Sequence, residues 1–182
     1  MLYDMHSCHV STIREHVNSF GIFSQHLVTF GNATRDSTLD ANFLFQFDAV
    51  VIHYSVRVSV NGHLSSDIFE KLKTYNGVKM LFIQDEYDNL KSTYGYINGL
   101  EIDVLFTCVP EKYLDYVYPR SRFPHLKFIH NLTGYVSYSQ ICSNNINTDK
   151  RGVDIFYRGR DLPFIYGSLG REKYEIGIKF KE

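Results

Sequence analysis

The stretch VKMLFIQDEYDN, residues 78–89, decides the fold class. Its first part, VKMLFIQ, is largely apolar at consecutive positions, which is typical of a strand buried on both faces, as in a parallel sheet. The run then stops in the polar letters QDEYD. We therefore expect a buried strand over residues 78–84 that ends in a polar loop.

The same pattern recurs along the chain, with helix-like segments between the apolar runs. STIREHVNSFGIF, residues 11–23, has Ser11 as a candidate cap and apolar residues at helical spacing. Repeated strand–helix–strand units predict an α/β fold, a Rossmann-like doubly wound parallel sheet with helices on both faces. The predicted strands are residues 1–7, 26–30, 47–55, 78–84, 102–108 and 126–132, and the other predicted helices are 65–77 and 109–119.

The composition of the sequence changes after residue 136. Residues 137–150 are polar and rich in Asn and Ser, which predicts a linker. VDIFYRGR, residues 153–160, then reads as a strand, and residues 168–182 read as a helix. A lone strand and helix form no core of their own, so this part is expected to be the last unit of the sheet or the first unit of a second domain.

The totals exclude several classes of protein. The chain has 182 residues, a formal net charge of −1 and three widely spaced cysteines. A net charge this close to zero gives no positive electrostatic potential that would favour nucleic acid. The spacing of the cysteines fits no zinc site. We expect a cytoplasmic protein, because the N-terminus lacks the pattern of a signal peptide. No stretch approaches the roughly 20 apolar residues of a membrane span, so membrane contact is expected to be peripheral at most, at the inner face.

Candidate functional residues follow the predicted strands. Ligands of open α/β sheets bind beyond the carboxyl ends of the strands, so these polar residues are expected to meet at one edge. They are His53, Tyr54 and Arg57 after one strand, Gln84, Asp85, Glu86 and Asp88 after the next, Thr107 after the third, and Arg158, Gly159 and Arg160 after the strand that follows the linker.

Each group has a functional and a structural interpretation. His53 suits a base near neutral pH or a satisfied structural side chain. Arg57 suits a phosphate or a surface ion pair. The three carboxylates Asp85, Glu86 and Asp88 fit either a Mg²⁺ or Mn²⁺ site or a rim that pairs with arginines. In RGR, residues 158–160, two guanidinium groups flank a glycine, which suits a diphosphate.

Five blocks of the sequence together resemble bacterial family-1-type glycosyltransferases of the GT-B fold. The resemblance covers nearly the whole chain. The blocks are FDAVVIHYSVRVS (47–59), VKMLFIQDEYDN (78–89), IDVLFTCVPEKYLDYVYP (102–119), FIHNLTGYV (128–136) and VDIFYRGRDLPFIYGSLGREKYEIGIKF (153–180).

The resemblance implies a domain plan. GT-B enzymes have two Rossmann-like domains with the active site between them. Residues 1–136 would be the acceptor-side domain, 137–150 the linker, and 151–182 the first strand and helix of a donor-side domain that is incomplete here. The rest of that domain is expected in a longer protein or in a partner chain.

The resemblance also implies roles. The function would be transfer of a sugar from a nucleotide-sugar co-substrate to a hydroxyl of a glycan or lipid-linked acceptor in cell-surface polysaccharide synthesis, without a metal cofactor. His53, Asp85 and Glu86 are the candidate bases. Tyr54, Arg57, Gln84, Asp88, Thr107 and the segment 158–160 would bind substrates. The alternatives are a non-catalytic module that binds a glycan or a partner, and a metal-dependent enzyme that uses the three carboxylates.

Overall fold

The computed structural model describes residues 1–132, 135–137, 152–153 and 155–180. The chain divides into two compact units, Met1–Ser137 and Tyr138–Glu182, and each is described by itself. Of the predicted linker 137–150, only Ser137 lies within the described residues.

The first unit is built on a parallel sheet, which confirms the predicted α/β class. Within the described residues, six strands form one sheet in the order β2-β1-β3-β4-β5-β6, and all neighbouring strands are parallel. This order reverses direction beside β1, as expected of a Rossmann-like doubly wound sheet. The strands are β1 (Leu2–Tyr3), β2 (Gly31–Asn32), β3 (Ala49–Ile52), β4 (Val78–Phe82), β5 (Val104–Thr107) and β6 (Lys127–His130).

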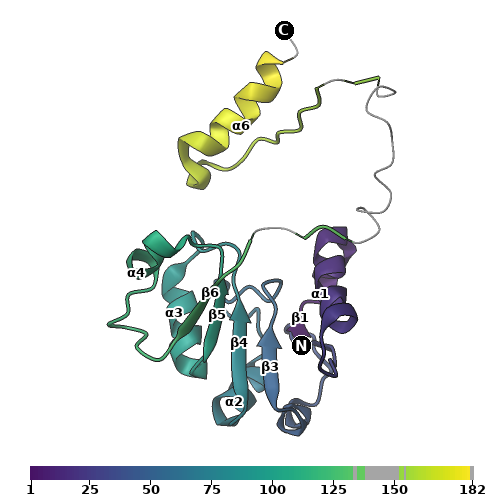
Figure 1. The fold of residues 1–182 in the computed structure, drawn as a ribbon, viewed down its shortest axis with the longest axis vertical. Coiled ribbons are helices and arrows are strands. Elements are labelled where there is room, and N and C mark those ends of the chain that lie inside the picture. Colours follow the sequence, from purple (N-terminus) through teal and green to yellow (C-terminus); the bar gives the residue numbers. More distant parts are fainter. Residues whose placement is uncertain (133–134, 138–151, 154, 181–182) are drawn as a thin grey trace. The chain divides into compact units, whose positions relative to one another are not determined.

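Helices connect these strands and, as predicted, cover both faces of the sheet (Figure 1). The α-helices of the first unit are α1 (Ser11–Phe23), α2 (Ser66–Thr74), α3 (Leu90–Leu100) and α4 (Leu114–Val117), with 3-10 turns at η1 (His6–His9), η2 (Ala41–Gln46) and η3 (Glu111–Tyr113). The second unit contains η5 (Phe164–Tyr166) and α6 (Gly167–Lys179).

The register of the strands places the main core on one face. Parallel pairing aligns Ile52 with Leu81 and Leu81 with Leu105, so these side chains form a row. They belong to one buried cluster with Ile68 of α2 and Ile97 of α3. The opposite face carries the alternate residues of the same strands, because successive strand side chains point to opposite sides.

Aromatic side chains cover part of this second face. The rings of Phe82 on β4 and Phe106 on β5 stack with centroids 4.1 Å apart. Phe20 of α1 meets the Phe82 ring edge-on at 5.5 Å, and His16 of α1 does so at 6.0 Å. Helix α1 therefore packs on the face opposite the main core, and it brings one histidine to the end of β4.

Two predicted local features differ from the structure. The strand expected at residues 26–30 lies instead at Gly31–Asn32, where Gly31 and Ala33 donate to backbone oxygens beside β1. The apolar run just before it is not in the hydrogen-bonded ladder, and Leu27 is 96% exposed. The expected cap Ser11 is already the first residue of α1, and Val10 precedes it without a capping side chain.

One helix has no counterpart among the predicted helical segments. Helix α3 begins after Asn89, whose side chain accepts a hydrogen bond from the Ser92 N–H. Asn89 has φ of 38°, a left-handed conformation that asparagine tolerates. Two glycines dilute the apolar pattern of this helix, and only the burial of Thr93, Ile97 and Leu100 shows its inner face.

The strand predicted at residues 153–160 is not formed in the part of this segment that the structure describes. A β-strand needs a neighbour for its backbone groups, and none of the described residues 153 and 155–160 belongs to a sheet. The predicted helix is present as α6, and the Tyr157 hydroxyl donates to the Lys173 carbonyl of that helix.

Candidate functional site

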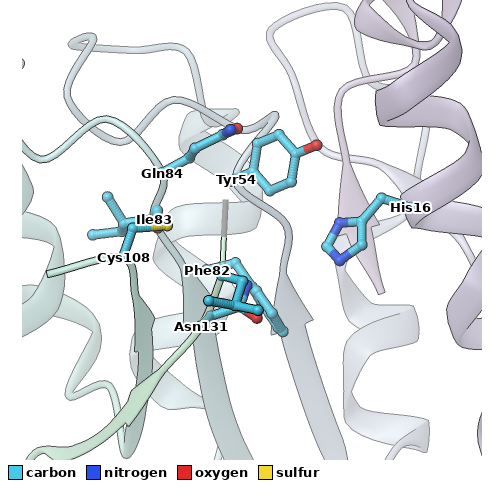
Figure 2. Close-up of a pocket in the computed structure, with 8 residues that line it drawn as sticks. His16, Tyr54, Phe82, Ile83, Gln84, Cys108 and Asn131 are labelled. Atoms are coloured by element: carbon cyan, nitrogen blue, oxygen red, sulfur yellow. The ribbon is translucent and has the colours of Figure 1, made fainter. Parts of the chain in front are cut away.

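A small pocket lies at the carboxyl edge of the sheet, where the sequence predicted convergence (Figure 2). Its volume is about 20 Å³, which is room for a water molecule or two. Residues that follow four neighbouring strands meet here with one side chain from α1. The lining residues are His16, Tyr54, Phe82, Ile83, Gln84, Cys108, Asn131 and Leu132.

The fold explains why these side chains meet. The strands β3, β4, β5 and β6 are parallel and adjacent, so their carboxyl ends lie at one edge. Tyr54 comes two residues after β3, Gln84 two residues after β4, Cys108 directly after β5 and Asn131 directly after β6. His16 reaches the same place from the middle of α1 (Figure 2).

A buried histidine contacts a half-buried one beside the pocket. His53 is fully buried, and its Nε2 lies 2.9 Å from Nδ1 of His16. Burial, with a smaller contribution from His16, lowers the pKa of His53 to about 3. Burial also lowers the pKa of His16. Both imidazoles are therefore neutral at pH 7. His53 is not among the pocket-lining residues, and its candidate role as a base stays a prediction.

Tyr54 and His16 form an aromatic surface at the pocket. Their rings stack with centroids 5.4 Å apart and an interplanar angle of 26°. Burial raises the pKa of Tyr54, and the carboxylate of Asp85 adds to this effect. The phenol therefore keeps its hydrogen at neutral pH and can donate to a ligand.

A second small pocket adjoins the first and shares Tyr54 and Gln84 with it. Its volume is about 30 Å³, and Arg57 and Asp85 also line it. Asp85 is exposed and accepts a hydrogen bond from the Tyr87 hydroxyl at 3.1 Å. The predicted residues Tyr54, Arg57, Gln84 and Asp85 are thus brought together.

Glu86 takes a different direction from Asp85. Its Oε1 accepts hydrogen bonds from the Thr107 hydroxyl and from the backbone N–H of Cys108, the latter at 3.0 Å. Thr107 is fully buried, and its hydroxyl oxygen also accepts from the Val109 N–H at 3.1 Å. Glu86 therefore ties the loop after β4 to the end of β5.

Asp88 forms an ion pair with an arginine, which is one of the two roles that the sequence suggested for the carboxylates. Its Oδ2 accepts from the Arg57 guanidinium at 2.9 Å and from the Ser59 hydroxyl at 2.7 Å. The hydrogen bond from Ser59, followed by that from Arg57, lowers the pKa of Asp88. This ion pair joins the loops that follow β3 and β4.

The three neighbouring carboxylates do not form a metal cage. Each has its own partners, as described above, and their side chains diverge. Within the ranges that the structure describes, no three His, Cys, Asp or Glu side chains gather as metal ligands. The arrangement gives the metal-dependent alternative no geometric support.

Arg158, Gly159 and Arg160 belong to the second unit, and all three are exposed there. A Cβ atom at Gly159 would lie 2.4 Å from the Lys173 carbonyl oxygen, so the glycine permits close packing against α6. The expectation that this segment faces the same cleft as the first unit stays a prediction.

His16 lines the pocket, and the sequence pattern did not predict it as a functional residue. Its helix was predicted with the observed bounds, yet the pattern of Ile13, Val17 and Phe20 marks only the apolar face. Helical periodicity does not tell which turn reaches the end of a strand. The histidine between Ile13 and Phe20 was the feature of this helix that could have indicated a polar contact with the strand ends.

A larger cavity of about 480 Å³ lies near the beginnings of the strands. Mostly apolar side chains line it, among them Leu2, Leu27, Phe43, Phe47 and Met80. Its few polar groups suit an apolar ligand better than a sugar. The carboxyl edge offers the hydrogen-bonding side chains of His16, Tyr54, Gln84 and Asn131 instead.

In the part of the chain that the structure describes, no helix combines the length and apolarity needed to cross a bilayer. Compared with protein-family models, with curated proteins and with solved structures, the chain matches none of them.

Proposed function

We propose that the first unit is the acceptor-side domain of a glycosyltransferase that uses a nucleotide-sugar co-substrate. The observation that carries this proposal is the pocket edge where Tyr54, Gln84, Asn131 and His16 converge. Such an edge offers amide donors and acceptors together with an aromatic face, which is what recognition of a polyhydroxylated ligand requires. The resemblance of the sequence blocks supplies the reaction class.

The proposed reaction is the attack of an acceptor hydroxyl on the anomeric carbon of the donor. A bond forms between the hydroxyl oxygen and that carbon while the bond to the diphosphate oxygen breaks. The hydroxyl proton goes to a base, and Asp85 suits this role because its carboxylate is exposed beside the pocket edge. Glu86 is the less suitable base, since Thr107 and Cys108 already engage one of its oxygens.

The departing diphosphate needs positive charge or hydrogen-bond donors. By the resemblance, we propose Arg158 and Arg160 of the second unit for this role, with no metal cofactor. The acceptor is a glycan or a lipid-linked saccharide in cell-surface polysaccharide synthesis.

The test is release of nucleoside diphosphate by the full chain, assayed with a panel of nucleotide sugars and acceptor saccharides. Asp85→Asn is expected to reduce turnover about 100-fold or more, because a general base contributes about 10²–10⁴-fold. Glu70→Gln, a matched change in an exposed carboxylate paired with Lys73 on α2, is expected to leave turnover unchanged. Equal turnover by the wild type and Asp85→Asn would reject Asp85 as the base.

A second candidate is a non-catalytic module that binds a glycan. The small size of the two edge pockets, about 20 and 30 Å³, favours it, because neither encloses a sugar ring. The stacked rings of Tyr54 and His16 would then serve as a binding surface. Calorimetric binding of a saccharide without donor turnover would select this candidate, and neither binding nor turnover would reject both.

A further inference from the structure

We infer that His53 fixes His16 as a hydrogen-bond donor, a neutral imidazole whose N–H on Nε2 serves the pocket. The ligand atom next to His16 is then an oxygen that accepts a hydrogen bond, and His16 is not the base of the reaction. The inference deepens the proposed function and rests on it only for the identity of the ligand.

The hydrogen bonds around His53 determine its tautomer. The backbone N–H of Ser55 donates to Nδ1 of His53 at 3.1 Å. A backbone amide nitrogen only donates, so this ring nitrogen carries a lone pair. The Ser55 hydroxyl oxygen, 2.9 Å from the same nitrogen, accepts from the Asp4 N–H at 3.0 Å, which leaves the hydroxyl hydrogen free to point at Nδ1. The single ring hydrogen of neutral His53 is therefore on Nε2.

The tautomer of His53 in turn determines which nitrogen of His16 carries the hydrogen. Nε2 of His53 lies 2.9 Å from Nδ1 of His16, so the N–H of His53 donates to that nitrogen. Nδ1 of His16 must then carry a lone pair, and neutral His16 holds its hydrogen on Nε2. Nε2 of His16 has no hydrogen-bond partner among the described residues, and the ring lines the pocket (Figure 2).

The surroundings of His16 keep it neutral. The ionisable side chains next to it are those of His53, Tyr54 and Tyr135, and Cys108 lines the same pocket. Burial raises the pKa of both Tyr54 and Cys108, so neither provides an anion at pH 7 that would favour the imidazolium form.

At the pocket edge, one residue therefore positions the ligand and another accepts the proton. A nitrogen that carries a hydrogen has no lone pair for a substrate proton, so Nε2 of His16 positions a ligand oxygen. Hydroxyl, ring, carboxylate and phosphate oxygens all qualify as acceptors. A carboxylate accepts the proton instead, and Asp85 lies close enough to the pocket for this role. His53, buried behind His16, acts as a positioning residue.

The experiment is nuclear magnetic resonance of the full chain with ¹⁵N-labelled histidine near pH 7, where ring nitrogen shifts report the tautomer. We expect His53 and His16 each to show a single neutral tautomer with the hydrogen on Nε2. Exposed His125 is the internal reference, because solvent lets its tautomers exchange. A hydrogen on Nδ1 of either His53 or His16 overturns the inference.

Variants separate positioning from general support of the fold. His53→Leu removes the donor, so His16 is expected to populate both tautomers and to titrate at a higher pH, since its lone pair is no longer engaged. His53→Gln offers an amide N–H in place of Nε2 and is expected to restore the single tautomer. Ser55→Ala is the control, because it leaves the backbone donor to His53 in place. Unchanged His16 signals in a folded His53→Leu chain overturn the inference.

If His53→Leu does not fold, the wild-type tautomers and His53→Gln still decide the question. The result is also distinct from that of the turnover assay. Both tautomers can be as expected in a chain that transfers no sugar, which would reject the enzyme alone. An active chain with the opposite tautomer at His16 would reject this inference alone.

Discussion

Buried Thr107 shows how single residues hold the pocket edge together. Its hydroxyl donates to Glu86 and accepts from the Val109 N–H, so one side chain satisfies two groups. Thr107→Val keeps the shape and removes both bonds. We expect the free energy of unfolding, measured by urea titration, to fall by about 1–3 kcal/mol.

A double-mutant cycle isolates the bond to Glu86. In a Glu86→Ala background the hydroxyl has lost that partner, so Thr107→Val is expected to cost less there. A coupling energy of about 0.5 kcal/mol or more supports the bond. Strict additivity of the two substitutions contradicts it.

The ion pair between Asp88 and Arg57 makes stability depend on pH. The folded pKa of Asp88 lies below its ordinary value, chiefly through the Ser59 hydroxyl and then Arg57. The contribution is therefore complete above the ordinary carboxyl pKa and is lost as the pH falls through the lower, folded value. Asp88→Asn is expected to cost about 1 kcal/mol at pH 7, since the pair is partly exposed.

Thermal unfolding between pH 7 and pH 2 tests this expectation. The difference between wild type and Asp88→Asn should shrink as the pH falls below about 4, where carboxylates begin to protonate. Glu70→Gln is the control, because its exposed pair with Lys73 is expected to contribute about 0.5 kcal/mol or less. A difference that stays constant over this range contradicts the assignment.

At the scale of elements, the turn between α2 and β4 has no room for a side chain. A Cβ atom at Gly77 would lie 2.6 Å from the Asp48 carbonyl oxygen and 2.1 Å from the Tyr75 hydroxyl. The Tyr75 hydroxyl is itself bonded to the Phe47 carbonyl at 2.7 Å, so it does not move freely. Gly77→Ala is expected to lower the free energy of unfolding by about 1–3 kcal/mol.

Gly95 provides the matched control within α3. It lies inside the helix, and a Cβ atom there would have no neighbour within 4 Å. Gly95→Ala is therefore expected to stabilise the protein by about 0.5–1 kcal/mol, because alanine loses less backbone freedom in a helix. Equal effects of the two substitutions would show that the turn is not tightly packed.

Strands and helices could be predicted from the sequence where apolar residues dominate them. The central strands β3, β4 and β5 fall within the predicted segments, because their apolar runs stand out, although one face of these strands is only partly covered. Strand β2 has only two residues, and its pairing with β1 decides its position. Helix α3 was missed, because its apolar residues are interrupted by glycines and its start depends on the Asn89 side chain.

The candidate site was predictable in its location and not in its chemistry. The topology of a parallel sheet brought Tyr54, Gln84 and Asp85 to one edge, as expected. The partners of Glu86 and Asp88 come from loops distant in sequence, so their structural roles needed the fold. The contact between His16 and His53 spans 37 positions of the sequence and has no local signal.

At the scale of the whole molecule, the buried core belongs to the first unit. All residues of the hydrophobic cluster lie between Leu2 and Leu126. In the described part of the second unit, Gly170 is the residue that is buried. We expect a chain that ends at Ser137 to unfold in one cooperative transition, with a midpoint within a few degrees of that of the full chain.

Calorimetry and circular dichroism of the two chains provide the test. Retained near-ultraviolet signals would show that the fixed packing of the aromatic side chains is intact in the shorter chain. Loss of the cooperative transition would mean that the second unit stabilises the sheet, which would contradict independent folding of residues 1–137.

The proposed function requires that ligands bind at the carboxyl edge of the sheet. Its most direct test is chemical-shift mapping of the labelled full chain, titrated with nucleotide sugars and with methyl glycosides. We predict saturable changes at His16, Tyr54, Gln84 and Asn131, with none at Phe43 or Phe47 in the apolar cavity. Changes confined to that cavity, or none at the edge with any of these ligands, would contradict the claim.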